Sequence, residues 1–217
     1  AEGEGRGRSA LRLRRMTGAV SREDFSRRIF DRLADAGVTL FTHVPDFGND
    51  ELVKMAEADN RTTAVLLSSE QEGVALCAGA DLVGARGVLL MQSSGVGNCP
   101  NMLSLVRGGR FPMLMIVTMR GVYGEQNPWQ YPMGQAVEPV LEAMGIQCIR
   151  VERDDELDQA TDSAISTAFA AGQGGKTRRR SVRPASFRGV LPGGAGLMGG
   201  GLRRGTGAGG VGAPPPQ

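Results

Sequence analysis

Short apolar runs alternate with helical apolar spacings from about residue 21 to residue 171. Ser21, followed three residues later by Asp24, forms an approximate capping box and predicts a helix start. Gly37 predicts the end of that helix. A nearly uninterrupted apolar run at 112–118 is typical of a strand buried on both faces. Further strands are expected at 38–44, 63–67, 87–92 and 146–151, and further helices at about 49–58, 70–83, 135–144 and 155–171 and after Pro100.

This alternation predicts the fold class. Strands that alternate with helices form right-handed βαβ units, so we expect an α/β, doubly wound parallel sheet with helices on both faces. In such sheets ligands bind at the carboxyl ends of the strands. The segments at those ends are His43–Asp46, Ser68–Glu72, Gln92–Asn98 and Thr118–Glu125.

Both ends of the chain differ in composition from the middle. From Gly172 onward there are fifteen of the thirty-three glycines, seven Arg, one Lys and no acidic residue. Such a segment has too little apolar surface to offset the entropy of ordering it. Residues 1–15 are similar, with five Arg and two Glu. We therefore expect one domain at 16–172, a disordered extension at 1–15 and a disordered, basic Gly/Arg/Pro-rich tail at 173–217.

The tail has a second interpretation. If the codons for residues 180–189 are read from the second base of each, suitable synonymous choices encode an aliphatic residue followed by Leu-Phe-Ala-Gln-Arg-Leu-Phe-Gly. That sequence is typical of a last strand and turn. We therefore hypothesise that the chain beyond about Gly172 is a frameshifted translation. Resequenced DNA that confirms the tail codons and offers no such alternative frame would contradict this hypothesis.

Charge and cysteine placement exclude several classes of protein. The chain carries +2, the tail +8 and residues 1–15 carry +3, so residues 16–171 carry −9. Arg-Gly runs without interleaved aromatic residues attract nucleic acid only weakly, which disfavours a nucleic-acid function. With no long apolar run and no signal-peptide pattern, we expect a cytoplasmic protein without a membrane partner. Cys77, Cys99 and Cys148 are far apart in mostly apolar surroundings and indicate reduced core thiols.

Two carboxylates, Glu70 and Glu72, begin the expected helix at 70–83. Acids in a first helical turn are stabilised by the positive end of the helix dipole, so simple capping explains either one. However, the residues behind Glu70, at positions 74 and 77–79, are small and apolar, which is unusual for a solvated helix face. This pattern favours a site where something flat and bulky packs beside Glu70.

Two other segments at the strand ends have more than one interpretation. Ser94–Asn98 is either a generic turn or a phosphate-binding loop at a helix start. The chain lacks Gly-x-x-x-x-Gly-Lys-Ser/Thr, and no Gly-x-Gly-x-x-Gly occurs at its first strand, so nucleotide binding is disfavoured. His43, the only histidine, ends a strand, where a structural role and a substrate contact are both open.

Several motifs together resemble the pyrimidine-binding (PYR) domain of thiamine-diphosphate enzymes. The resemblance covers 38–173 and is strongest to the sulfopyruvate decarboxylase alpha subunits, with phosphonopyruvate decarboxylases as near relatives. Motifs in the same order are far more specific than any one of them. The matching segments are HVPD at 43–46, EQEGVALCAGA at 70–80, MQSSGVGN at 91–98, and RGVYGEQNP and QYPMG between 120 and 134.

The resemblance implies a role for Glu70. In these enzymes an acid at its position hydrogen-bonds N1′ of the cofactor's aminopyrimidine, which lets the ring take a proton from the thiazolium carbon. That carbon then attacks the ketone of a 2-oxoacid, and carbon dioxide leaves. Glu72 is the rival for the same role, because the two acids stand close together in the sequence.

The resemblance also implies contacts with cofactor and substrate. Arg120 suits a sulfonate or phosphonate because its planar guanidinium presents paired donors, although an exposed ion pair explains Arg120 and Glu125 equally well. The implied cofactor-binding residues are Pro45, Glu70, Ser93, Ser94, Gly95, Gly97 and Asn98, and the candidate substrate contacts are His43, Asp46, Arg120 and Glu125.

One expected motif is missing. Thiamine-diphosphate enzymes anchor the diphosphate through Mg²⁺ with a Gly-Asp-Gly motif, which this chain lacks, so no metal ligand is assigned to it. The resemblance therefore implies that a separate diphosphate-binding (PP-domain) beta subunit holds Mg²⁺ and shares thiamine diphosphate with this chain. We expect the alpha-type subunit of a carboxy-lyase for an anionic 2-oxoacid, inactive alone. A noncatalytic α/β ligand-binding or regulatory module and a defective gene product remain the alternatives.

Overall fold

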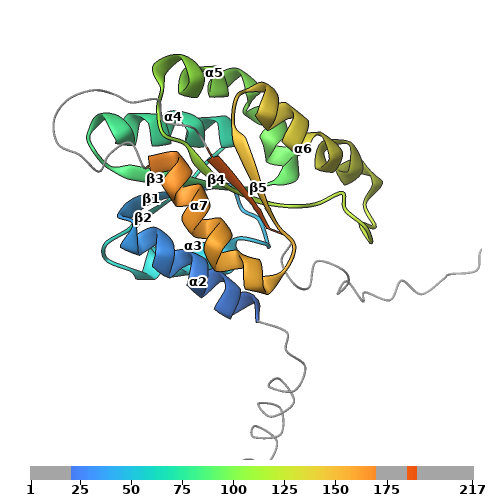
Figure 1. Ribbon diagram of the computed structural model, residues 1–217, viewed down its shortest axis with the longest axis horizontal. Helices are drawn as coiled ribbons and strands as arrows, with labels where there is room; N and C mark the ends of the chain where they lie inside the picture. The colour runs from blue at the N-terminus through green and yellow to red at the C-terminus, as the bar shows by residue number, and fades with distance from the viewer. Residues whose placement is uncertain (1–20, 170–184, 190–217) are drawn as a thin grey trace, which may run out of the picture.

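The computed structural model describes residues 21–169 and 185–189, and these residues build one sheet with its covering helices (Figure 1). The strands are β1 (Val38–His43), β2 (Thr63–Leu66), β3 (Arg86–Gln92), β4 (Leu114–Thr118), β5 (Gln147–Val151) and β6 (Ala185–Gly189). The α-helices are α2 (Arg22–Asp35), α3 (Asp50–Ala58), α4 (Glu70–Leu82), α5 (Pro100–Gly109), α6 (Tyr131–Ala143) and α7 (Leu157–Phe169). Three short 3₁₀ helices are η1 (Ser93–Asn98), η2 (Pro128–Gln130) and η3 (Asp154–Glu156).

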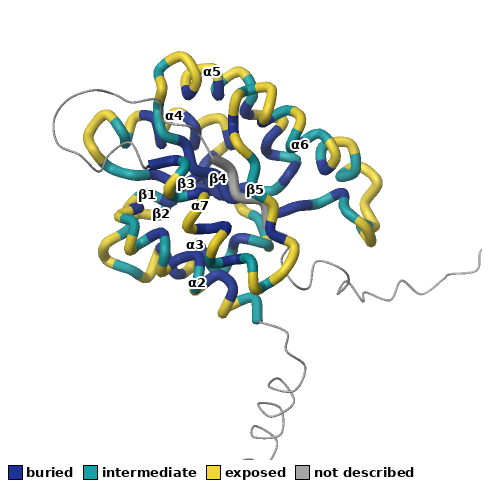
Figure 2. Tube along the Cα trace, viewed as in Figure 1, coloured by how far each residue is buried: buried dark blue, intermediate teal, exposed yellow. Residues whose placement is uncertain are grey.

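All neighbouring strands of the sheet are parallel, in the order β2-β1-β3-β4-β6-β5. The helices α4, α5 and α6 cover one face, and α2, α3 and α7 cover the other (Figure 1). Two buried hydrophobic clusters fill the two layers, and the strands at the centre are buried while the helices are exposed on their outer sides (Figure 2). The predicted doubly wound α/β fold is confirmed.

The β6 strand corrects the expectation for the tail. We expected residues 173–217 to be disordered, but residues 185–189 pair with β4 on one side and with β5 on the other. The segment has no long apolar run, so the hydrophobic pattern gave no strand signal there. A domain that ended at residue 172 would lack a central strand. The extension at 1–15, the rest of the tail and the frameshift hypothesis concern residues that lie largely outside the described ranges.

Local signals placed most element ends. Ser21 caps α2 by accepting a hydrogen bond from the Asp24 backbone N–H at 3.0 Å, as expected. Gly37, which follows α2, has a φ of +75°, a conformation that favours glycine. The start of α6 was wrong by several residues, because Pro132 lies within the first turn of the helix and not before it. Proline is well tolerated there, since its missing N–H would have no helical partner.

Helix α4 packs unusually close to the sheet. A Cβ added at Gly73 would lie 2.5 Å from Leu89 Cδ1, and one added at Gly87 would lie 2.8 Å from Cys77 Sγ. Larger residues at these two positions would push the helix away from β1 and β3. The close packing therefore sets where the first residue of α4, Glu70, lies at the carboxyl end of the sheet.

None of the helices in the described ranges has both the length and the apolar character needed to cross a lipid bilayer.

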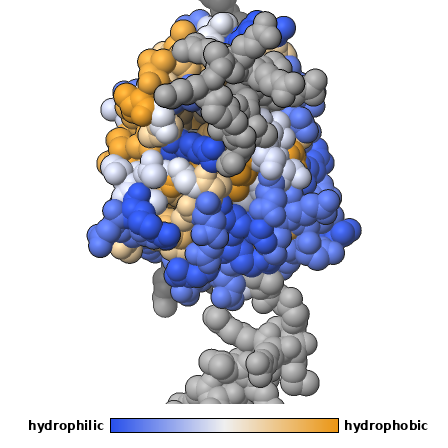
Figure 3. Space-filling model, turned by 60° about the vertical axis from the view of Figure 1, so that its left-hand side comes forward, coloured by the Kyte–Doolittle hydropathy of each residue, from blue (hydrophilic) through white to orange (hydrophobic). Residues whose placement is uncertain are grey.

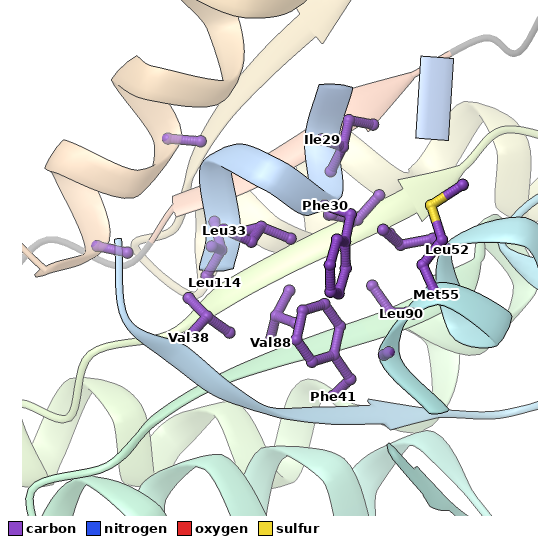
Figure 4. Close-up of a cluster of buried hydrophobic side chains, with 14 of the residues drawn as sticks. Ile29, Phe30, Leu33, Val38, Phe41, Leu52, Met55, Val88, Leu90 and Leu114 are labelled. Carbon is purple, nitrogen blue, oxygen red and sulfur yellow. The ribbon is translucent and has the colours of Figure 1, made fainter. Parts of the chain in front are cut away.

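The hydrophobic cluster on the face of the sheet that α2, α3 and α7 cover provides a test of stability. Phe41 is fully buried in the cluster that Figure 4 shows, and its ring centroid lies 5.7 Å from that of Phe30. We expect Phe41→Ala to lower the free energy of unfolding by about 3–5 kcal/mol, because the substitution removes buried surface and leaves a cavity. Urea denaturation followed by circular dichroism measures the change.

The matched control is Phe47→Ala. Phe47 is 76% exposed, and the Arg22 guanidinium lies 3.9 Å from its ring centroid. Loss of this contact costs about 1 kcal/mol or less at an exposed site. Equal losses for the two alanine variants would contradict a core role for Phe41.

Candidate active site

The two acids at the start of α4 lie in different environments. Glu70 is only 7% exposed, and its Oε2 accepts a hydrogen bond of 2.8 Å from Asn98 Nδ2. Glu72 is exposed, and its Oε2 accepts a hydrogen bond of 2.9 Å from the Ser68 backbone N–H. Glu72 therefore caps the helix start, whereas the Glu70 carboxylate is turned into the protein.

The 3₁₀ helix η1 forms the wall opposite Glu70. A Cβ added at Gly95 would lie 2.4 Å from Glu70 Oε1, so only glycine leaves room for the carboxylate in this position. Among the described residues, Oε2 has Asn98 as its donor, and no hydrogen bond reaches Oε1. The segment expected to be a turn or a phosphate-binding loop is thus a compact helical turn that holds a buried carboxylate.

The buried thiol beside this carboxylate is inert. Burial raises the pKa of Cys99 to about 12, and the charge of Glu70 adds to the shift. Cys77 lies deeper against β1, and burial likewise raises its pKa to about 12. Both thiols therefore stay protonated at neutral pH, as expected for core cysteines.

The small residues behind Glu70 have a different role from the one expected. Val74, Cys77 and Ala78 are buried against the sheet of this chain, so they do not line a space beside Glu70. Gly79 is exposed, and a Cβ added there would meet nothing within 4 Å. The room that the Glu70 carboxylate occupies is left by Gly95, not by the outer side of α4.

A hydrogen-bond cluster joins the ends of β1 and β4 across β3. Asp46 Oδ2 accepts a hydrogen bond of 2.5 Å from Thr118 Oγ1 and one of 3.3 Å from Asn49 Nδ2. Both donors also reach the Met91 carbonyl oxygen, each at 3.4 Å. Asp46 is therefore held in place by its neighbours. Thr118 and Asn49 were missed as site residues, because their partners are distant in sequence or lie in the backbone.

His43 lies on the other face of the sheet from Glu70. Thr42 points toward Cys77 of α4, so the next residue along the strand points to the opposite face. His43 is buried, and this burial lowers its pKa although the Glu57 charge opposes the shift. An open pocket on this face is lined by His43, Pro45, Asp46, Phe47, Asp50, Val53 and Lys54.

Arg120 and Glu125 form an ion pair that organises the segment after β4, with the Arg120 side chain 43% exposed. The guanidinium donates to both carboxylate oxygens, at 2.7 and 2.9 Å, and only 8% of the Glu125 side chain is exposed. Glu125 also accepts hydrogen bonds from the backbone N–H groups of Gly121 and Asn127. The Arg120 backbone N–H donates to Ser93 Oγ at 3.1 Å, which connects this segment to η1. Arg120 is the exposed partner and Glu125 the buried one, so the ion pair and a ligand contact at Arg120 are compatible.

The expected site residues fall into two groups. Glu70, Ser93, Gly95 and Asn98 come together around η1, with Arg120 and Glu125 joined to them through Ser93. His43, Pro45 and Asp46 line the separate pocket at the end of β1. Within the described ranges, no three His, Cys, Asp or Glu side chains are grouped so that they could hold a metal ion.

Comparison with protein families identifies the chain. Residues 23–149 match the family model described as thiamine pyrophosphate enzyme, N-terminal TPP binding domain. The chain belongs to this thiamine pyrophosphate enzyme family. The match covers the described elements from α2 to β5 and includes the site around Glu70.

Relatives of this thiamine pyrophosphate enzyme domain include archaeal subunits. The chain is 33% identical over 132 residues to sulfopyruvate decarboxylase subunit alpha of Methanocaldococcus jannaschii, covering 60% of this chain and 78% of the relative. It is 33% identical over 153 residues to the same subunit of Methanothermobacter thermautotrophicus, covering 68% and 92%. The phosphonopyruvate decarboxylase of Streptomyces viridochromogenes is 33% identical over 141 residues, covering 64% of this chain but 34% of that protein. The predicted family is confirmed.

A solved structure supports the fold of the thiamine pyrophosphate enzyme domain independently. A thiamine diphosphate-dependent 4-hydroxybenzoylformate decarboxylase from Rhodococcus jostii superposes with a TM-score of 0.58 at 14% identity, over 76% of this chain and 30% of the other. At this identity the comparison shows a shared fold only.

The Arg120–Glu125 pair predicts a pH dependence. The Arg120 guanidinium and then the Asn127 N–H lower the pKa of Glu125 from 4.5 to about 2. Because the pKa in the folded protein is lower, ionised Glu125 contributes stability above about pH 4.5, and this contribution is lost as the pH falls toward 2. The difference in free energy of unfolding between wild type and Glu125→Gln should shrink over that range. A difference that stays constant down to about pH 2 would contradict the ion-pair role.

Proposed function

We propose that this chain is the alpha-type subunit of a thiamine-diphosphate-dependent 2-oxoacid decarboxylase of the sulfopyruvate or phosphonopyruvate class. The observation that carries the proposal is the Glu70 carboxylate, which is buried, bonded through Oε2 to Asn98 and enclosed at Oε1 by Gly95. The family membership and the relatives named sulfopyruvate decarboxylase subunit alpha support it.

The residues around Glu70 fit the aminopyrimidine of thiamine diphosphate. Glu70 Oε1 has no hydrogen-bond donor among the described residues, so it is available to a ring nitrogen. Gly95 makes room for the carboxylate itself, and Gly97 follows it in η1 beside the Met133 side chain. Ser93, Ser94 and Asn98 would flank the ring with them, and Pro45 would lie at its outer end.

When bound, thiamine diphosphate supplies a carbon nucleophile that also holds the electrons released on decarboxylation. Glu70 Oε1 would share a proton with a nitrogen of the bound pyrimidine, while Asn98 keeps Oε2 in place. The choice of Glu70 over Glu72 is supported by burial, since Glu72 is exposed and its oxygen already caps the helix. Val96 and Cys99 exclude water from the inner side of Glu70, because both are fully buried.

The substrate side of the site is proposed at the ends of β1 and β4. Arg120 would bind the anionic group of the 2-oxoacid through the donors that Glu125 does not use, and Glu125 would fix the guanidinium in that position. Asp46, held by Thr118, would stand at the mouth of the site between the ends of β1 and β4. His43 would contact a substrate only from the separate pocket at the end of β1. The three acids Glu70, Asp46 and Glu125 face one cationic side chain, that of Arg120, which is already paired with Glu125, so this half of the site is short of positive charge.

A partner subunit supplies the missing part. The proposed partner is a diphosphate-binding (PP-domain) beta subunit that holds Mg²⁺ and the diphosphate. Two observations support it: the relatives are named as one subunit of an enzyme, and the described residues group no metal ligands. Positive charge brought by the partner would also complement the acidic residues 16–171.

The proposal is tested by Glu70→Gln. The full chain, co-expressed with a candidate PP-domain chain, is assayed for carbon dioxide release from sulfopyruvate and phosphonopyruvate with thiamine diphosphate and Mg²⁺. We expect Glu70→Gln to lower turnover at least about 100-fold, because proton transfer loses its acid. Glu72→Gln is the matched control and should retain turnover, since glutamine can still accept the Ser68 N–H. A stable complex without turnover on any 2-oxoacid would instead favour a noncatalytic binding or regulatory module.

A second prediction concerns the space beside Glu70. We expect Gly95→Ala to weaken thiamine diphosphate binding by the complex about 10- to 100-fold, because the new methyl group displaces a charge-assisted hydrogen bond. Isothermal titration calorimetry measures the affinity. Gly79→Ala, on the exposed side of α4, is the control and should leave the affinity unchanged. Equal affinities for wild type and Gly95→Ala would contradict the placement of the cofactor.

A further inference from the structure

Two aromatic side chains stand out from the segment between β4 and α6, at the right of Figure 1. Tyr123 is fully exposed and Trp129 is 86% exposed. Scattered exposed hydrophobic residues are common, but two large, exposed aromatic rings only six positions apart are unusual on a free surface. A space-filling view from another side shows hydrophobic residues gathered on part of that face (Figure 3). Leu76 and Leu82 of α4 and Val83 just after it are also exposed.

The loop that carries the two aromatics is built to hold one shape. Glu125 joins the Arg120 side chain to the backbone of Gly121 and Asn127, and the Tyr131 hydroxyl donates to the Glu125 carbonyl oxygen at 2.8 Å. Asn127 Oδ1 accepts a hydrogen bond of 3.2 Å from the Trp129 N–H. The exposure of the two rings is therefore fixed by the loop around them.

Close backbone packing adds to this rigidity. Gly121 has a φ of +70°, and a Cβ added there would lie 2.2 Å from the Gln130 carbonyl oxygen. A Cβ added at Gly134 would lie 2.2 Å from the Arg120 carbonyl oxygen. The backbone at the start of the loop, at residues 120–121, is thus in close contact with the backbone at residues 130 and 134. Only glycine at positions 121 and 134 permits this contact.

The loop borders the Glu70 site. Its first residue, Arg120, donates its N–H to Ser93 at the start of η1, and Met133 just after it lies beside Gly97 near the end of η1. A molecule that covers η1 would therefore lie next to the loop. Because Arg120 and Glu125 neutralise one another, the loop meets such a molecule mainly through its aromatic rings.

We propose that Tyr123 and Trp129 are the anchors by which this chain binds the subunit that supplies the diphosphate and metal contacts. The inference rests on the proposed function, which requires such a subunit over the same site. Tyrosine and tryptophan are the residues that most often dominate interface energies when they enter a pocket on the partner. A preformed loop also loses little conformational freedom on binding, so more of the contact energy remains as affinity.

The second subunit fits this surface better than a second copy of this chain. A second copy would bring another site around Glu70 and not the metal and diphosphate contacts that the proposed function requires. The described part of the chain contains no cluster of His, Cys, Asp or Glu that could bind a metal ion. The occupant we assign carries an apolar pocket for the rings beside its own cofactor-binding groups. Self-association of this chain through the loop is a separate outcome of the test.

Trp129 is the only tryptophan in the chain, which allows a direct measurement. The full chain is labelled with 5-fluorotryptophan, and its single ¹⁹F resonance is followed while an unlabelled PP-domain chain is added. The wild-type pair is first shown to decarboxylate a 2-oxoacid with thiamine diphosphate and Mg²⁺. We expect the resonance to shift and to lose its H₂O/D₂O isotope effect, because the indole becomes buried. An active pair in which the indole stays exposed to water overturns the inference and leaves the proposed function standing.

Variants test the energy of the contact. We expect Trp129→Ala to weaken binding of the PP-domain chain about 30-fold or more. Tyr123→Ala should weaken binding by a smaller factor, and Trp129→Phe should bind nearly as tightly as the wild type. Val83→Ala is the matched control, since Val83 is 83% exposed at the opposite end of α4. Circular dichroism checks that each variant folds. Unchanged affinity in Trp129→Ala overturns the proposal, as does light scattering that shows the chain alone forming a dimer that Trp129→Ala dissociates.

Discussion

The close contact between α4 and the sheet is the constraint on which the site depends. Gly73 and Gly87 remove the side chains that would hold the helix away from β1 and β3. The start of the helix therefore lies low against the carboxyl end of the sheet, and the first carboxylate of α4 reaches into the turn of η1. Gly95 completes this geometry from the other side, since any side chain there would overlap the carboxyl group. Gly73, Gly87 and Gly95 together therefore determine where the Glu70 carboxylate lies.

The second constraint is electrostatic. Residues 16–171 carry −9, yet the described acids at the carboxyl edge are used in distinct ways. Asp46 is bound by Thr118, Glu72 caps a helix, and Glu125 neutralises Arg120. Glu70 differs from them in burial, because it is the only acidic residue of the described ranges that is buried as a whole residue. Its Oε2 is bound by Asn98 and its Oε1 has no donor among the described residues.

Much of the fold could be predicted from the sequence, because the signals that determine helices, strands and their ends lie within a few residues of one another. The capping pair at Ser21, the glycine at 37 and the apolar run before Thr118 each determine structure within a few residues. The roles of Glu70 and Glu72 could not be separated in this way, since both stand in the same helical turn. Their difference comes from Asn98 and Ser68, and thus from how η1 folds back on α4. The link between Asp46 and Thr118 spans 72 positions and has no local signal.

Strand β6 was missed for a related reason, since it is defined by its neighbours and not by its own pattern. Its place between β4 and β5 has a consequence for how the chain folds. Among the described strands β5 pairs only with β6, so β5 and β4 both keep an unpaired edge until residues 185–189 arrive. During synthesis the other five strands leave the ribosome before residues 185–189, so they can pair before β6 is present. Open strand edges are the surfaces through which folding intermediates aggregate. Quick pairing of this one short, late strand with β4 and β5 would therefore shorten the time for which both edges stay open.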